Sequence, residues 1–362
     1  MKTILFSFLI FLFFYGCSND NLVNTNNFNS PPAQQNEFDL IGFEGKSIFT
    51  FEVNPVNPNY IIVSTKSPRG LYLTSNFGRN WTQIDSNIVT TAMKYSLNNP
   101  ETIYLCNVRD VSNHYYGLVY KSTNYGRSFS GLDSSLRTWP MARPLKIEID
   151  PLNTEIFYLH LGSYIPTDPA DIIISRNGGK NINHLSSASN SYSQLQVQDI
   201  LDICVNPKRT GSIFTIGSPI YNDPKILYST DFGENWAIND LTLNSFMKKI
   251  SCFDEIIVIG GNNSLAISID NGKNFSIVST SNFEYTFLNE ILVTNDKKIF
   301  ISLMPGINSK NTLIYLSDDK GQSWKKLSND TDYKYNLRYD SNNRFLYMIK
   351  EGDNSGLYRF KL

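Results

Sequence analysis

Hydrophobic and polar residues alternate along this chain in short runs typical of β-strands. Seven times, two such runs are joined by a tight turn, most often one rich in Asn and Pro. Pro presets the backbone φ angle and Asn tolerates the left-handed region, so these residues between β-rich runs favour turns. Each pair of runs therefore predicts a β-hairpin. The predicted hairpins span residues 51–65, 93–107, 147–161, 202–217, 250–262, 291–303 and 337–350.

A second pattern, which we call the box, follows six of these hairpins. It consists of a β-rich run, a Ser or Thr, an Asp or Asn two residues later, a Gly two residues after that, and a bulky apolar residue three further on. The six copies span residues 71–81, 119–129, 172–182, 226–236, 265–275 and 314–324. Their glycines lie 39 to 54 residues apart, and self-similarity at such a period indicates a repeat architecture.

The residue types of the box suit a tight turn. In the fourth copy, Asp231 can accept hydrogen bonds from the turn's own amides, Ser229 can do the same more weakly, and Gly233 can take a positive φ. We expect Trp236 to fold back and pack between sheets. We therefore assign the Asp or Asn of each copy a structural role, not a metal or sugar site. These residues are Asn76, Asn124, Asn177, Asp231, Asp270 and Asp319.

One hairpin, the run before the box and the stretch after it supply four strands per repeat. Four-stranded sheets repeated radially are the blades of a β-propeller. We predict an all-β fold, a seven-bladed β-propeller over residues 37–362. The last repeat stops after 355–362, which aligns with a third strand, and residues 36–43 precede the first hairpin with Phe38 at the place of a box aromatic. We expect this N-terminal strand to complete the last blade, which would hide two sheet edges.

The N-terminus has a different pattern. Lys2 precedes an apolar run over residues 4–15, followed by Gly16 and Cys17. An apolar helix of this length spans roughly 18 Å, short of the roughly 30 Å hydrocarbon core, so residues 1–16 are predicted to be a signal peptide. A Cys directly after a small residue resembles the lipobox of bacterial lipoproteins, in which that Cys is lipidated. Ordinary secretion with cleavage nearby is the alternative.

The segment after Cys17 predicts a tether. Residues 17–36 are polar and Asn-rich and contain two adjacent prolines, a composition that cannot bury enough apolar surface to order itself. We expect an extracytoplasmic protein whose contact with a bacterial membrane is the lipid anchor only. Ser18 is compatible with sorting to the outer membrane.

Composition supports a β-rich core and excludes one class of partner. Of the 362 residues, 41% are hydrophobic and 13% aromatic, enough for a large core. With 32 basic and 33 acidic residues and no run of like charge, nucleic acid is not expected as a partner. Beyond Cys17 the cysteines are an odd set, Cys106, Cys204 and Cys252, which we expect to be buried free thiols. A bridge between Cys204 and Cys252 is the alternative.

The pairing of a Pro-Asn-Pro hairpin turn with the box, as in Ser229, Asp231, Gly233 and Trp236, resembles the Asp-box or BNR-repeat propellers. The branch it resembles contains the sortilin luminal domain, the xyloglucanases and the photosystem assembly factors, and the resemblance covers residues 37–362. Sialidases also carry such boxes but open with an Arg-Ile-Pro motif that this chain lacks. Xyloglucanases bind substrate between two propellers, and each propeller provides a catalytic Asp. This chain contains a single predicted propeller, which argues against that activity.

Loop lengths point to one face of the predicted ring. In a propeller, connections between second and third strands and between blades lie on one face, and here they are long and variable, which is typical of a binding surface. They span residues 107–117, 162–170, 183–199, 218–225 and 304–310. Aromatic side chains with a polar handle suit sugars or proteins. The binding candidates are Trp139 with Arg137 and Arg143, and Tyr115, Tyr116, Tyr164 and Tyr221. Alternatively, Trp139 only caps the second and third blades.

No pair of residues marks catalysis. Asp110, Asp168 and Asp199 are weak candidates on that face, but their spacing marks no carboxylate pair for glycoside hydrolysis. His114, His160 and His184 are scattered without ligand spacing, so we expect no metal and no cofactor. The sequence favours a non-enzymatic binding or scaffold lipoprotein, monomeric, that engages a glycan or an envelope protein. The alternatives are a glycoside hydrolase or lyase on the same propeller and an assembly factor for a membrane complex.

Overall fold

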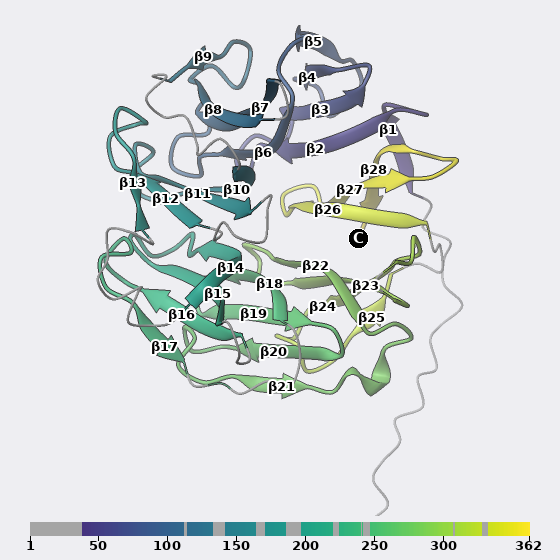
Figure 1. The fold of residues 1–362 in the computed structure, drawn as a ribbon. Coiled ribbons are helices and arrows are strands. Elements are labelled where there is room, and N and C mark those ends of the chain that lie inside the picture. The colour runs from purple at the N-terminus through teal and green to yellow at the C-terminus, as the bar shows by residue number, and fades with distance from the viewer. Residues whose placement is uncertain are drawn as a thin grey trace, which may run out of the picture. The chain divides into compact units, whose positions relative to one another are not determined.

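The computed structural model describes residues 38–362, except 112–113, 133–141, 164–170, 186–196, 220–223, 240, 242–246, 307 and 328–331. Cys17 and the residues predicted to form a signal peptide and a tether lie outside the described residues. The folded part belongs to one compact unit, Gln35–Leu362. It consists of seven four-stranded antiparallel sheets, so the predicted seven-bladed propeller is confirmed (Figure 1).

Each of the first six blades contains four consecutive strands. Blade 1 has β2 (Ser47–Val53), β3 (Ile61–Ser67), β4 (Gly70–Thr74) and β5 (Thr82–Asp85). Blade 2 has β6 (Thr90–Tyr95), β7 (Ile103–Val111), β8 (His114–Ser122) and β9 (Ser130–Gly131). Blade 3 has β10 (Ala142–Ile149), β11 (Phe157–Ser163), β12 (Asp171–Ser175) and β13 (Asn183–His184).

The second half of the chain continues this order. Blade 4 has β14 (Val197–Val205), β15 (Ile213–Pro219), β16 (Lys225–Ser229) and β17 (Ala237–Asn239). Blade 5 has β18 (Met247–Phe253), β19 (Ile256–Gly261), β20 (Ser264–Ser268) and β21 (Ser276–Val278), followed by the short 3₁₀ helix η2 (Thr280–Asn282). Blade 6 has β22 (Phe287–Val293), β23 (Ile299–Met304), β24 (Leu313–Ser317) and β25 (Lys325–Lys326).

Blade 7 closes the ring by joining the two ends of the folded unit. It combines β26 (Tyr333–Asp340), β27 (Phe345–Glu351) and β28 (Gly356–Lys361) with β1 (Asp39–Gly42) in the order β1-β28-β27-β26. Asp39 pairs with Arg359 and Leu40 with Tyr358, as predicted. The first strand of every blade contacts the first strand of the next, and β26 contacts β2. These seven first strands therefore form the innermost circle.

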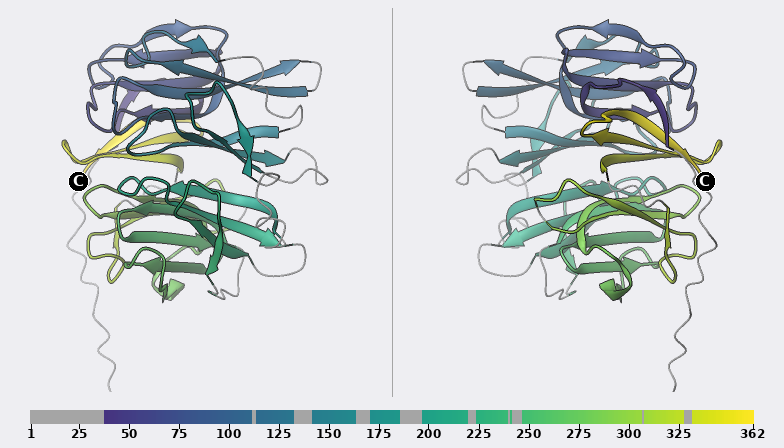
Figure 2. Two further views of the ribbon diagram at one scale, coloured as in Figure 1. Left: turned by 90° about the vertical axis from the view of Figure 1, so that its left-hand side faces the viewer. Right: turned by 90° about the vertical axis from the view of Figure 1, so that its right-hand side faces the viewer.

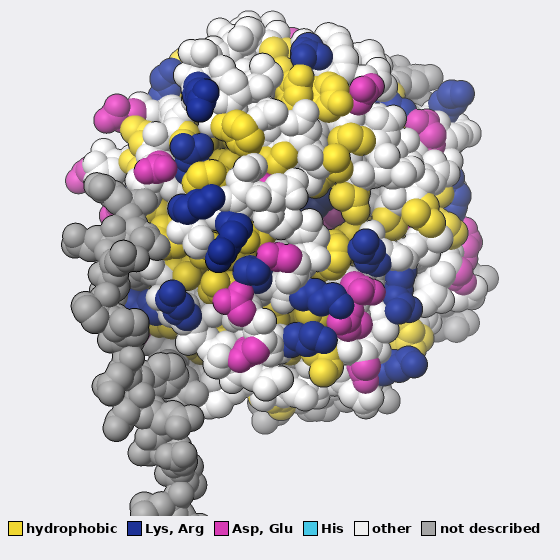
Figure 3. All heavy atoms as spheres, turned by 180° about the vertical axis from the view of Figure 1, so that it is seen from behind, with side chains coloured by type: hydrophobic (Ala, Val, Ile, Leu, Met, Phe, Trp, Pro, Cys, Tyr) yellow, Lys and Arg dark blue, Asp and Glu magenta, His cyan; other side chains and the backbone are white. Residues whose placement is uncertain are grey.

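The connections lie on two faces. The turns between first and second strands and the boxes lie on one side, which we call the short-turn face. The connections between second and third strands and between blades lie on the other, the long-loop face (Figure 2). Figure 3 shows the short-turn face.

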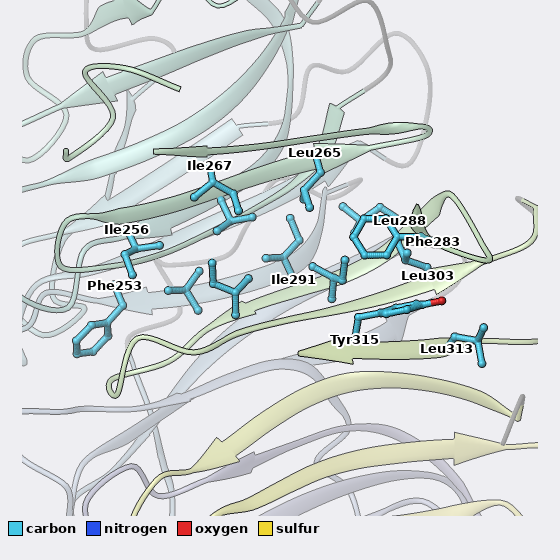
Figure 4. Packing of buried hydrophobic residues seen from close by; sticks show 14 residues of the cluster. Phe253, Ile256, Leu265, Ile267, Phe283, Leu288, Ile291, Leu303, Leu313 and Tyr315 are labelled. Atoms are coloured by element: carbon cyan, nitrogen blue, oxygen red, sulfur yellow. The ribbon is translucent and has the colours of Figure 1, made fainter. Parts of the chain in front are cut away.

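The hydrophobic core is divided into layers between neighbouring blades. Between blades 5 and 6, for example, Ile256 and Leu265 pack against Leu288 and Ile291, and all four are buried (Figure 4). Burying one such side chain contributes roughly 1.5–3 kcal/mol. Because each blade is apolar on both sheet faces, it is stabilised by two neighbours, and closure of the ring leaves no blade with an uncovered face.

The boxes share one hydrogen-bonding scheme. In blade 4, Ser229 Oγ accepts from the Gly233 amide (2.9 Å) and Asp231 Oδ1 accepts from the Asn235 amide (2.9 Å). The serine or threonine oxygen accepts from the box glycine amide in all six copies. Gly233 has φ 85° and Phe232 before it has φ 64°, so two successive residues are left-handed. The sequence pattern marks only the glycine, because the residue before it varies.

The cysteines correct one prediction. Cys204 in β14 and Cys252 in β18 form a disulfide, so the expectation of free thiols was wrong for this pair. The innermost strands of blades 4 and 5 bring the two Cα atoms within 6.1 Å, a separation that a disulfide can span. Cys106 is free and buried, as predicted, and burial raises the pKa of its thiol.

Candidate functional site

The most distinctive element of the long-loop face is an extension of blade 2. β7 and β8 pair along their whole length as far as Val111 and His114. In the described part of the chain, β6 pairs with β7 only as far as Asn107. Residues 108–111 and 114–117 therefore continue as a two-stranded β-ribbon beyond the four-stranded part of the sheet (Figure 2). The sequence predicted a loop here, which is wrong because β7 and β8 continue to pair up to Val111 and His114.

The ribbon brings together three predicted site residues. Asp110 in β7 lies opposite Tyr115 in β8, and Tyr116 lies opposite Arg109. Two further candidates lie in strands of other blades, Arg143 opposite Gly162 in blade 3 and Asp199 opposite Ser218 in blade 4. Outside the described residues lie Trp139, Arg137, Tyr164, Tyr221 and Asp168. Of the carboxylates suggested for catalysis, Asp110 lies in blade 2 and Asp199 in blade 4, with blade 3 between them.

The structure also contains a circle of charged residues that the sequence analysis missed, which we call the inner charge circle. Every innermost strand contributes at least one member. The members are Glu52, Lys94, Lys146, Glu148, Asp202, Lys249, Glu290 and Arg338. A signal was present in the sequence, because each predicted hairpin carries a charged residue in its first β-rich run or just before that run.

The inner charge circle is held together by ion pairs between blades. Arg338 of blade 7 pairs with Glu52 of blade 1. Lys94 Nζ of blade 2 lies 3.4 Å from Glu148 Oε2 of blade 3, and Lys146 Nζ of blade 3 lies 3.1 Å from Asp202 Oδ1 of blade 4. These contacts link the first strands of neighbouring blades where the hydrophobic layers end.

The electrostatics of this circle favour charged, paired groups. Burial alone would raise the pKa of the Asp202 carboxyl, but Lys146 and Lys249 outweigh burial and lower that pKa. Burial alone would lower the pKa of the Lys146 ammonium. The negative charges of Asp202 and Glu148 outweigh the effect of burial, so that pKa is raised. Asp202 Oδ2 additionally accepts from the Ile250 amide (3.0 Å). A carboxylate held in this way braces the ring and is poorly suited to general acid chemistry, which needs a raised pKa.

Two of the histidines have defined partners. His160 in β11 is buried, with Nε2 3.0 Å from the Ile200 carbonyl oxygen, and burial lowers the pKa of its imidazole. His160 is therefore an interior residue whose ring is hydrogen-bonded between blades 3 and 4. His184 Nδ1 in β13 lies 2.6 Å from Asp171 Oδ2 in β12. Within the described ranges, no three potential metal ligands come together, and no helix is long and apolar enough to cross a membrane.

Comparison with known proteins identifies the fold. No protein-family model matches the chain, and no curated protein matches it. Among solved structures, the chain is similar to YCF48 from Cyanidioschyzon merolae, with a TM-score of 0.63 and 14% identity over 90% of this chain and 98% of that one. A structure of YCF48 bound to D1 peptide has a TM-score of 0.60 and 11% identity, over 90% and 94% of the two chains.

A third similar structure is the GH74 xyloglucanase from Xanthomonas campestris. Its TM-score is 0.65 at 13% identity, and the match covers 89% of this chain but 53% of that enzyme. This chain therefore spans about half of the enzyme's length. At such identities the similarities show a shared propeller fold, and fold alone does not determine activity.

Proposed function

We propose that this chain is a non-enzymatic binding lipoprotein of the cell envelope. Lipidated at Cys17, it would engage a glycan or an envelope protein through the long-loop face. The observation that carries the proposal is the β7–β8 ribbon. Short hydrogen-bonded turns close the short-turn face, whereas this ribbon extends from the other face with Tyr115 and Tyr116 on one strand.

The Cys204–Cys252 disulfide supports an extracytoplasmic location. Disulfides form and persist in oxidising compartments such as the periplasm and the cell surface and are rare in the cytosol. The bridge agrees with the signal peptide and lipobox pattern at residues 1–17. The uniform hydrogen bonding of the six boxes likewise supports membership of the Asp-box propellers.

A role as an assembly factor is the second candidate, and the ribbon favours it. In the described part of the chain, no strand pairs with the outer sides of residues 108–111 and 114–118. An extended peptide can add to such an edge through main-chain hydrogen bonds. The structurally similar YCF48 has been solved with D1 peptide bound, which supports a peptide or protein partner for this chain as well.

The glycoside hydrolase alternative needs a carboxylate pair. Such enzymes place two carboxyl groups roughly 5 to 9.5 Å apart across the scissile bond. The carboxylates of the inner charge circle do not suit this role, because Glu52, Glu148 and Asp202 each have a cationic partner. Asp110, Asp168 and Asp199 remain the candidates if turnover is found.

A binding screen with parallel activity measurement tests the proposal. The full chain is applied to a polysaccharide array and to detergent-solubilised envelope proteins from the producing cell, and released reducing sugar is measured. We expect binding without turnover, lost in Trp139→Ala and in Tyr115→Ala. The matched control is Tyr125→Ala on the short-turn face, which should bind normally. Sugar release abolished by Asp110→Asn, Asp168→Asn or Asp199→Asn would overturn the proposal in favour of an enzyme.

A further inference from the structure

The chain enters the folded unit on the short-turn face. β1 begins at Asp39, which pairs with Arg359 near the end of β28. The chain after β28 ends beside the first turn of blade 7, where the Leu362 amide donates to the Arg344 carbonyl (3.0 Å). The predicted lipid anchor at Cys17, about 20 residues before β1, is therefore joined to this face and not to the long-loop face.

The same face carries exposed aliphatic side chains on three consecutive blades, which we call the apolar arc. Val56 of blade 1 is 50% exposed, Leu97 of blade 2 is 37% exposed and Leu152 of blade 3 is 66% exposed. All three lie in the turn between the first and second strands of their blade. Blade 1 is the neighbour of blade 7, so the arc begins next to the point where the chain enters.

Hydrogen bonds between the turns hold the apolar arc in place. Asn54 Nδ2 of blade 1 donates to the Pro100 carbonyl of blade 2 (2.6 Å), and Asn98 Nδ2 of blade 2 donates to the Leu152 carbonyl of blade 3 (3.0 Å). The three turns therefore form one continuous strip. Turns fixed in this way present these side chains without a cost for ordering the backbone on contact.

Aromatic and cationic side chains lie beside the arc. Tyr60 stacks on Tyr125 with ring centroids 4.4 Å apart, and Arg127 lies over both rings and donates to the Tyr60 hydroxyl (2.7 Å). Arg79 and Lys180 are exposed in the boxes of blades 1 and 3. Tyr, Arg and Lys combine an apolar body with a polar end, which suits the headgroup region of a bilayer.

The other half of this face has a different character. In blades 5 and 6 the corresponding turns carry paired charges, with Lys297 Nζ 2.7 Å and Lys320 Nζ 3.2 Å from Glu255 Oε1. In Figure 3, hydrophobic side chains gather in the upper part of the face, over blades 1 and 2, and charged ones are more frequent below. Ile269 in the box of blade 5 is also exposed, at 55%, so the contrast lies in the first turns. Among the described residues, the first turns that carry exposed large aliphatic side chains are those of blades 1 to 3.

We propose that the apolar arc rests in the headgroup region of the membrane that bears the chain's own lipid anchor, an inference that rests on the proposed function. A coil of about 20 residues, as the composition of residues 18–37 predicts, has a root-mean-square length of roughly 25 Å. Such a tether keeps the short-turn face near the bilayer, and inserted aliphatic side chains add a second attachment. The long-loop face then points away from the membrane toward its partner.

Site-directed spin labelling of the full, lipidated chain in vesicles of phosphatidylethanolamine and phosphatidylglycerol tests this orientation. Labels at Val56→Cys and Leu152→Cys should be more accessible to lipid-soluble oxygen than to a water-soluble nickel complex. Asp353→Cys on the long-loop face and Lys273→Cys in the charged sector are the controls and should show the reverse. Equal, water-like accessibility at all four positions would overturn the inference.

A second experiment distinguishes membrane contact by the apolar arc from lipidation at Cys17. Acyl labelling of the wild type and of Cys17→Ser reports whether Cys17 is lipidated, and its absence would contradict the proposed anchor alone. The mature chain from residue 17 onward, which lacks the apolar run of residues 4–15 and is unlipidated because it carries Cys17→Ser, should still float with the vesicles. Adding Val56→Ser, Leu97→Ser and Leu152→Ser should reduce that binding about tenfold. Unchanged vesicle binding of this triple variant would overturn the inference. In the spin-labelling experiment, labels that are shielded from the nickel complex without vesicles, through self-association, would overturn it as well.

Discussion

Two junctions of the ring join neighbouring blades at the same position by different chemistry. Between blades 7 and 1, Arg338 pairs with Glu52. Between blades 4 and 5, Cys204 is bonded to Cys252. Glu52 and Cys204 each stand two residues before the Asn that caps the first turn of the blade, Asn54 or Asn206.

The difference shows what this position requires. The innermost strands approach each other there, so a charged or thiol side chain at this position is stabilised by a partner across the junction. Either an ion pair or a disulfide provides that partner. The ion pair depends on two groups staying charged. The disulfide depends on an oxidising environment. Stability of the two junctions should therefore respond to different conditions.

Removing the disulfide should have the largest effect. In the double variant Cys204→Ser and Cys252→Ser, we expect the free energy of unfolding to fall by about 4 kcal/mol, because the bridge closes a loop with a sequence separation of 48 residues. Guanidinium unfolding measures the change. Reductant should lower the wild-type midpoint and leave the variant unaffected. Equal midpoints for the oxidised wild type and the variant would contradict the prediction.

Breaking the ion pair should cost somewhat less. Arg338→Leu leaves the Glu52 carboxylate, whose side chain is 6% exposed, without its partner, so we expect a loss of about 3 kcal/mol. The double variant with Glu52→Leu should recover part of it. Lys66→Ala, which breaks the exposed pair with Glu351, is the control and should change stability by less than about 1 kcal/mol. A similar small effect for Arg338→Leu would refute the bracing role.

Asp202 tests the inner charge circle through pH. Its folded-state pKa lies below the ordinary value of 3.8, so its contribution is present above that value and is lost as pH falls through the folded-state pKa. Asp202→Asn should be less stable than the wild type by about 2 kcal/mol at pH 7. The difference should shrink as the pH falls below 3.8. A difference independent of pH would mean that the charge of Asp202 does not matter.

The smallest expected effect concerns a single box. Ser229→Ala removes the acceptor for the buried Gly233 amide, and we expect a loss of about 1 kcal/mol in thermal or chemical unfolding. Ser229→Thr is the matched control, because Thr74 makes the equivalent bond to the Gly78 amide at 3.1 Å in the first copy. A threonine variant as unstable as the alanine variant would show that the hydroxyl is not what stabilises the turn.

Much of the fold could be predicted because its rules are local. Alternating hydrophobic residues, Asn-Pro turns and the box identify each blade within about 50 residues, and residues 36–43 could be assigned to the closing strand because a copy was incomplete at each end. The β7–β8 ribbon could not be predicted because residues 107–117 lack a local strand pattern. Tyr115 and Tyr116 lie in a polar segment whose length resembled a loop, and only pairing with β7 reveals the strand.

The sequence by itself determined the number of blades, their strand order and the turn chemistry, because those depend on neighbours a few residues apart. The tertiary structure alone decided that Cys204 meets Cys252, that Arg338 meets Glu52 across 286 residues, and that the chain enters on the face of the apolar arc. Such contacts arise from ring closure, which brings distant first strands together. No local pattern encodes which side chains then become partners.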